Sequence, residues 1–187
     1  MYNVANALTI LRIVLLPPLY IFIKGHHVFP TSVVLILIII TDVLDGYYAR
    51  KFHTQGVIGK VLDHGVDKIV SVFLSFMLYY FYNLPLWAFY FFVIRDLLIL
   101  FVGAAMFIQL KVAFGSLWLG KIAGAFYFGM VFAYILDFLD IARVFMYFSI
   151  VLFSIVLIVY PLKFFPVLKS RVFQKGGSEV GDQVLPF

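Results

Sequence analysis

The chain has 187 residues, of which 65% are hydrophobic and only 12% are charged. This composition excludes a soluble globular domain and indicates one integral membrane domain. The net charge of +5 suits an anionic membrane face or an anionic substrate, whereas dispersed basic residues predict no nucleic-acid partner. The absence of cysteine excludes disulfides, thiolate catalysis and cysteine-bound zinc.

Apolar segments follow one another along the chain, each of about 20 residues or more, which is enough to cross a bilayer as a helix. We therefore predict an all-α polytopic membrane protein with six transmembrane helices, at residues 3–23, 29–52, 60–84, 85–110, 115–139 and 141–165. The first segment opens with polar residues and then carries Pro17 and Pro18. We expect an N-terminal interfacial helical segment that bends into the first span. Residues 1–175 form the membrane domain, and residues 176–187 are expected to be a disordered tail or a cloning remnant.

The loop charges predict an orientation in the cell membrane. Six spans place both termini on one side, together with the second-to-third and fourth-to-fifth connections, where basic residues gather. The opposite side carries only Lys24 and Arg143. By the positive-inside rule, the termini are cytoplasmic. Gly120 and Gly124 form a small-xxx-small pair that would suit a homodimer.

Four aspartates stand between residues 41 and 70, where the apolar pattern breaks. Asp42 and Asp45 are three residues apart, and Asp63 and Asp67 are four apart, so each pair projects from one helix face. The short connection between the two segments makes them antiparallel neighbours, and all four carboxylates can converge at cytoplasmic depth. Unpaired, they would repel one another, so divalent cations are expected. Oxygen ligands without thiolate favour Mg²⁺ or Mn²⁺ over zinc.

Small residues and one arginine accompany the acids. Gly46 follows the second aspartate, and Gly59 lies one turn before the third, where a missing side chain admits a ligand or a backbone. Ala49 keeps the face of Asp42 and Asp45 open, and Arg50 supplies a fork suited to phosphate oxygens. A pair of metal ions beside an arginine outlines a phosphoryl-transfer site.

These residues carry a resemblance to a known family. In the order D-x2-D-G-x2-A-R-x8-G-x3-D-x3-D, they resemble the signature of the CDP-alcohol phosphotransferase (phosphatidyltransferase) family at every position: Asp42, Asp45, Gly46, Ala49, Arg50, Gly59, Asp63 and Asp67. The chain length and the six-helix layout are similar as well. The resemblance covers residues 1 to about 175.

The resemblance implies a membrane enzyme of phospholipid biosynthesis. Such an enzyme transfers the phosphatidyl group of CDP-diacylglycerol to an acceptor hydroxyl and releases CMP. The four aspartates would bind the metal ions, and Asp67 would also be the base that deprotonates the acceptor. Gly46, Ala49 and Arg50 would line the CDP site. The lipid would enter sideways from the bilayer, while CDP reaches the metals from the cytoplasm.

The acceptor is indicated by other residues. The N-terminal segment, Asp67-Lys68, Arg95-Asp96 and Gly120-Lys121 resemble the phosphatidylglycerophosphate synthases of this family, which would use the small phosphorylated alcohol glycerol 3-phosphate. The chain departs from those enzymes at Ala123 and Gly124, where they usually have Lys-Thr. Phosphatidylglycerol (as in cardiolipin synthase), inositol phosphate and serine therefore stay open as acceptors.

Arg95 and Lys121 are cations within spans, where burial without an anion is costly. They would contact an acceptor phosphate, or else neutralise acids or extend to the interface. Asp96 leans roughly 100° away from Arg95 round the helix, so the two side chains need not pair.

An ion transporter that uses intramembrane aspartates is the alternative from another class. The acids gather at one membrane face without an acidic path across the other half of the spans. No inverted repeat is visible either, which favours the enzyme.

Overall fold

The computed structural model describes the backbone of residues 4–51, 57–110 and 118–175, and the side chains of residues 7–44, 65–101 and 118–159. Throughout these ranges the elements are helices, because a backbone in lipid must satisfy its hydrogen bonds within the segment. Their bounds are α1 Val4–Lys24, α2 Val28–Lys51, α3 Val57–Tyr82, α4 Leu86–Leu110, α5 Trp118–Ile135 and α6 Leu139–Lys175. The predicted all-α class is confirmed.

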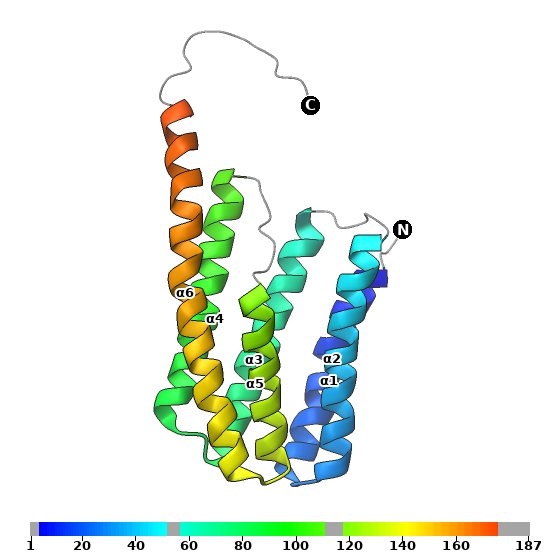
Figure 1. Cartoon of the computed structure of the whole chain (residues 1–187). Coiled ribbons are helices and arrows are strands. Elements are labelled where there is room, and N and C mark those ends of the chain that lie inside the picture. Colours follow the sequence, from blue (N-terminus) through cyan, green and yellow to red (C-terminus); the bar gives the residue numbers. More distant parts are fainter. Residues whose placement is uncertain (1–3, 52–56, 111–117, 176–187) are drawn as a thin grey trace.

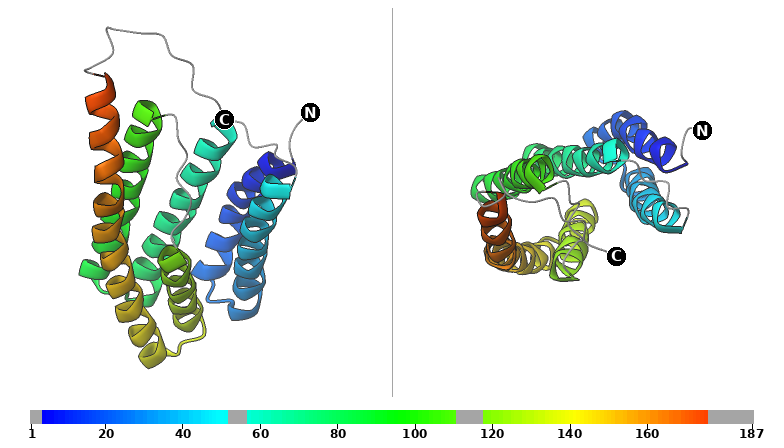
Figure 2. Two further views of the ribbon diagram at one scale, coloured as in Figure 1. Left: turned by 45° about the horizontal axis from the view of Figure 1, so that its top comes forward. Right: turned by 90° about the horizontal axis from the view of Figure 1, so that it is seen from above.

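The helices run alternately down and up in one bundle (Figure 1). The start of α1 and the end of α6 lie at the same end, the upper end of Figure 1, together with the end of α2 and the start of α3. α1 packs against both α2 and α3, and α3 also contacts α4 and α5. Seen from above, α1 and α2 lie at one side of the bundle and α4 and α6 at the other (Figure 2). The stretch that carries the four aspartates, from the end of α2 into α3, is therefore at the upper end of the bundle.

Tight turns close the lower end of the bundle. The α1–α2, α3–α4 and α5–α6 connections each contain one residue in the left-handed region, with φ of 52° at His26, 55° at Asn83 and 60° at Asp137. At the end of α1, the amide of His27 donates to the carbonyl of Phe22 at 2.9 Å, the Schellman pattern that satisfies a helix end. These caps reverse the chain within a few residues and keep successive helices antiparallel.

The outer surface of the bundle is apolar. Large hydrophobic side chains point outward, including Phe29 at 80% exposure and Trp118 at 77%. Within the described residues, α1, α3, α5 and α6 contain stretches long and apolar enough to cross a membrane: Ala7–Lys24, Gly65–Tyr82, Trp118–Ile135 and Leu139–Val159. α2 adds a shorter apolar stretch, Val28–Leu44. This is the surface of a membrane protein.

The last helix differs most from its prediction. α6 continues to Lys175, whereas the last apolar segment was expected to end at residue 165. Hydropathy predicts where burial in lipid ends, and not where the helix ends. The following residues include the good helix formers Leu168, Lys169 and Arg171, so the helix extends past the apolar segment. α1 runs as one helix from Val4 to Lys24, with Pro17 and Pro18 inside it. The predicted tail, residues 176–187, lies outside the described residues.

Candidate active site

Two of the motif aspartates meet on one arginine of α1. Nη1 of Arg12 donates to Oδ1 of Asp42, on α2, at 3.1 Å, and also to Oδ1 of Asp67, on α3. The two aspartates are 25 positions apart in sequence, and α1 contacts both of their helices. The expected convergence of the two motif segments is thus present for this pair, with α1 as the bridging element.

The two sides of this ion-pair cluster differ in exposure. The Arg12 side chain is only 1% exposed, whereas those of Asp42 and Asp67 are 47% and 36% exposed. The guanidinium therefore approaches from the protein interior. The carboxylates keep an open side, which a charged ligand can reach without first unpacking the core.

The other motif residues lie on the adjacent turns. Asp45, Gly46, Ala49 and Arg50 fall in the last turns of α2, and Gly59 and Asp63 in the first turns of α3; their side chains are outside the described set. Because α2 rises toward the upper end and α3 descends from it, both stretches lie at that end of the bundle (Figure 1).

The donor chemistry of the cluster fits a hard divalent cation. Asp42 and Asp67 present carboxylate oxygens from two helices, and the chain has no cysteine to select a softer metal. The described side chains by themselves contain no group of three or more metal-ligating residues, since Asp45 and Asp63 are not among them. The fit therefore rests on the convergence of Asp42 and Asp67 and on the helix positions of the other two.

A second charged cluster is buried between α3 and α4. Oδ1 of Asp96 accepts from Nε and Nη2 of Arg95, at 3.1 and 2.6 Å, and lies 3.2 Å from Nζ of Lys68. Arg95 and Asp96 are 3% and 1% exposed. The expectation that these neighbours need not pair is corrected here, because the long Arg95 side chain reaches Asp96 with two nitrogens. Nη2 of Arg95 also donates to Oγ of Ser71 at 3.0 Å.

α5 and α6 close around this second cluster. The Tyr127 hydroxyl donates to the backbone carbonyl of Ser71 and shares a hydrogen bond with Oγ of Ser75, each at 2.8 Å. The guanidinium carbon of Arg95 lies 3.8 Å from the centroid of the Phe153 ring, a cation–π contact. The buried polar groups thus connect α3 and α4 to the remaining two helices of that side.

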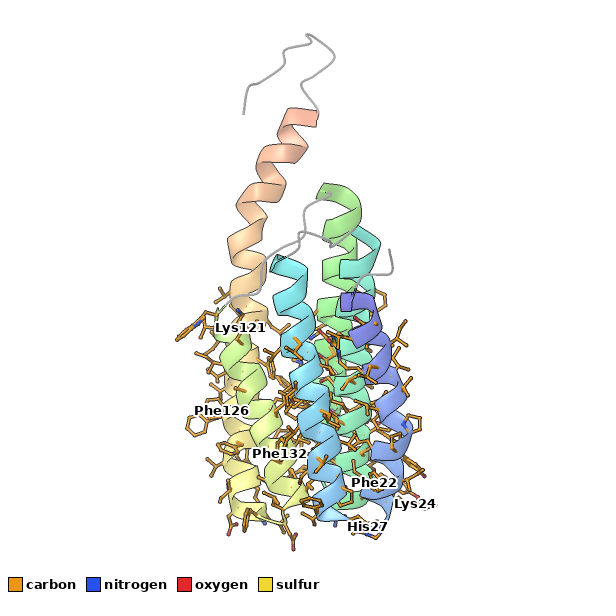
Figure 3. All side chains as sticks on the ribbon, turned by 90° about the vertical axis from the view of Figure 1, so that its right-hand side faces the viewer. Phe22, Lys24, His27, Lys121, Phe126 and Phe132 are labelled. Carbon is orange, nitrogen blue, oxygen red and sulfur yellow. The ribbon has the colours of Figure 1, made fainter. Side chains whose placement is uncertain are left out.

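Lys121 lies apart from Arg95. It is exposed near the start of α5 and projects from the outside of the bundle in Figure 3, far from Lys24 at the lower end. Among the described residues, no hydrogen bond or ion pair joins Lys121 to Arg95 or to an aspartate. The two cations predicted to contact an acceptor phosphate are therefore not brought into direct contact.

Comparison with known protein families matches residues 2–156 to CDP-alcohol phosphatidyltransferase. The chain belongs to this family. All eight motif positions, Arg12 and the Lys68–Asp96–Arg95 cluster fall within the matched residues. The family resemblance inferred from the motif is confirmed, and the comparisons give the ion-transporter alternative no support.

A relative within the CDP-alcohol phosphatidyltransferases is the "CDP-diacylglycerol--glycerol-3-phosphate 3-phosphatidyltransferase" of Aquifex aeolicus (strain VF5). It is 32% identical over 81 residues, which cover 43% of this chain and 45% of the relative. The chain thus matches a little under half the length of this relative.

The sequence prediction of the site in this CDP-alcohol phosphatidyltransferase omitted Arg12. A signal was present, because Arg12 is the single cation among residues 1–23 and stands within the predicted first span. A buried cation there requires an anion, and the motif aspartates are the acids nearest in sequence. Tyr127 gave no comparable signal, since the chain has 12 tyrosines and its role depends on packing against α3.

Proposed function

We propose that the chain transfers the phosphatidyl group of CDP-diacylglycerol to the hydroxyl of a small alcohol and releases CMP. The convergence of Asp42 and Asp67 on Arg12 carries the proposal, because it brings acids of both halves of the motif to one place. Membership of the CDP-alcohol phosphatidyltransferase family supports the donor. The activity named for the Aquifex relative supports glycerol 3-phosphate as the acceptor.

The four motif aspartates are the proposed ligands of two divalent cations, Mg²⁺ or Mn²⁺: Asp42, Asp45, Asp63 and Asp67. When bound, these ions would supply positive charge against the pyrophosphate and the departing CMP. On the protein side, Gly46, Ala49 and Gly59 leave room for CDP, and Arg50 donates to its phosphate oxygens.

The proposed reaction is a single displacement at phosphorus. The acceptor oxygen forms a bond to the phosphorus of the phosphatidyl group, and the bond from that phosphorus to the bridging oxygen breaks. CMP leaves with this oxygen and its electron pair. Asp67 accepts the proton of the acceptor hydroxyl. Its 36% exposure supports this role, since an incoming hydroxyl can reach the carboxylate.

Glycerol 3-phosphate carries a phosphate of its own, which needs cations of the protein as partners. Arg95 and Lys121 are the proposed contacts. Nη1 of Arg95 is buried and has no hydrogen-bond partner among the described residues, so it is an unused donor for a phosphate oxygen. The chain differs from phosphatidylglycerophosphate synthases at Ala123 and Gly124. Phosphatidylglycerol, inositol phosphate and serine are therefore compared as acceptors in the same assay.

The proposed setting is the cell membrane, with six spans, an interfacial N-terminal segment and the site facing the cytoplasm. The four apolar helices support the membrane location. CDP-diacylglycerol would enter sideways, so that its acyl chains stay in the bilayer.

A methyl group added at Gly120 or Gly124 would meet no atom within 4 Å, so this face of α5 has room for a second copy in a homodimer.

One assay tests the proposed reaction. The purified chain is incubated with Mg²⁺ or Mn²⁺, CDP-diacylglycerol and each acceptor in turn, and CMP release is measured. We expect release that depends on both the metal and glycerol 3-phosphate. Release only with another acceptor would replace the proposed acceptor, and no release with any acceptor would contradict the transferase activity.

A further inference from the structure

Arg12 stands where a cation is needed between two motif carboxylates. We propose that Arg12 is a positioning residue: a built-in counter-ion that holds Asp42 and Asp67 together before a divalent cation binds, and that lowers the affinity of the site for this cation. The inference rests on the proposed metal-binding role of these aspartates and assigns a role to a residue outside the motif.

The charges of Asp42 and Asp67 require a counter-ion. Two carboxylates held close together repel each other, and neutralising one of them by protonation would remove a metal ligand. Arg12 avoids this outcome because it places a positive charge beside both carboxylates. Its Nη1 atom contacts Oδ1 of both Asp42 and Asp67, so one cation satisfies both acids.

Arg12 leaves part of both carboxylates accessible to a divalent cation. Arg12 is 1% exposed and lies on the interior side of the pair, while the carboxylates are partly exposed on the other side. If Asp42 and Asp67 hold a divalent cation, the same carboxylates would serve it and the guanidinium of Arg12. Two positive charges that depend on the same acids disfavour each other.

The consequence is a reciprocal coupling. If the guanidinium and the divalent cation disfavour each other, removing the positive charge of Arg12 must raise the affinity for the cation. The same substitution must also destabilise the cation-free protein, in which Arg12 is the counter-ion. A residue with a merely structural role would lower stability equally with and without the cation, and would leave the affinity unchanged.

The test compares Arg12→Gln with the wild-type chain in detergent. Mn²⁺ binding is measured from the electron paramagnetic resonance signal of the free ion, and thermal unfolding is measured with and without Mn²⁺. We expect about 5-fold to 150-fold tighter Mn²⁺ binding by the variant, the usual range of coupling between two sites. We also expect a lower unfolding temperature without Mn²⁺ and a near-normal one with saturating Mn²⁺.

Two further variants control the test. Arg12→Lys keeps a positive charge and should recover most of the cation-free stability. Arg143→Gln removes an exposed arginine that pairs with Asp140 at 3.5 Å in the first turn of α6, and it should change neither quantity.

Unchanged or weaker Mn²⁺ binding by Arg12→Gln would overturn the inference. A variant that fails to fold even in saturating Mn²⁺ would overturn it as well, because the cation should then replace the missing charge. Failure of Arg12→Lys to restore stability would also count against it. If the wild-type chain binds no Mn²⁺, the proposed metal site itself fails, which is a separate result.

Discussion

Lys68 and Asp96 form an ion pair of 3.2 Å that joins α3 to α4. Lys68 directly follows the candidate base Asp67, so the same turn of α3 contributes one residue to the aspartate cluster and the next to the buried Arg95–Asp96 cluster. The two clusters therefore share one stretch of helix. A disturbance of the buried cluster should change the position of Asp67.

Asp96→Asn tests the buried cluster. The substitution removes the negative charge shared by Lys68 and Arg95 and leaves two cations packed against each other. Breaking a buried ion pair in this way typically costs about 3–5 kcal/mol. We expect a clear loss of thermal stability, measured by circular dichroism in detergent. As the matched control, Asp140→Asn breaks an exposed pair with Arg143 and should leave the unfolding temperature unchanged.

Tyr127→Phe tests the link from α5 to α3. The phenol hydroxyl bonds to the Ser71 carbonyl and to Ser75 Oγ in the buried core, and phenylalanine keeps the ring but removes both bonds. We expect the free energy of unfolding to fall by about 1–3 kcal/mol. Tyr147→Phe, at an exposed position on α6, is the control. Equal stabilities of the two variants would mean that the hydroxyl contacts of Tyr127 contribute nothing.

Asp67→Asn tests the proposed base. The amide keeps the size of the side chain but cannot accept the proton, so turnover should fall by about 10²- to 10⁴-fold. Mn²⁺ and CDP-diacylglycerol binding are measured alongside turnover, because Asp67 is also a proposed metal ligand. A variant that retained both binding steps and full turnover would show that another group takes the proton.

Arg95→Ala and Lys121→Ala test the proposed acceptor site. Each removes a cation proposed to contact the acceptor phosphate, so the KM for glycerol 3-phosphate should rise by about tenfold or more. The KM for CDP-diacylglycerol should stay the same. Lys121→Ala is the cleaner variant, since Lys121 is exposed while Arg95 also pairs with Asp96. An unchanged acceptor KM in both would exclude these residues from the site.

The helices and the motif were predictable from sequence because both depend on local patterns. Apolar runs predicted the helix positions to within a few residues for most of the chain, and aspartate spacing predicted that the acids share helix faces. The Arg12 contacts depend instead on how α1 packs, across separations of 30 and 55 residues to Asp42 and Asp67. The Arg95–Asp96 pair was missed for the opposite reason. Successive residues of a helix point roughly 100° apart. The long Arg95 side chain nevertheless reaches across that angle to Asp96.

The most direct test of the proposed function follows labelled glycerol 3-phosphate into lipid. Purified wild-type chain and Asp42→Asn are given CDP-diacylglycerol and Mn²⁺, and the organic-phase label and the released CMP are counted together. We predict one CMP released for each labelled lipid formed by the wild type, with product formation reduced at least about a hundredfold in the variant. Equal product formation by the two proteins, or CMP release without labelled lipid, would contradict a phosphatidyl transfer to glycerol 3-phosphate at the aspartate cluster.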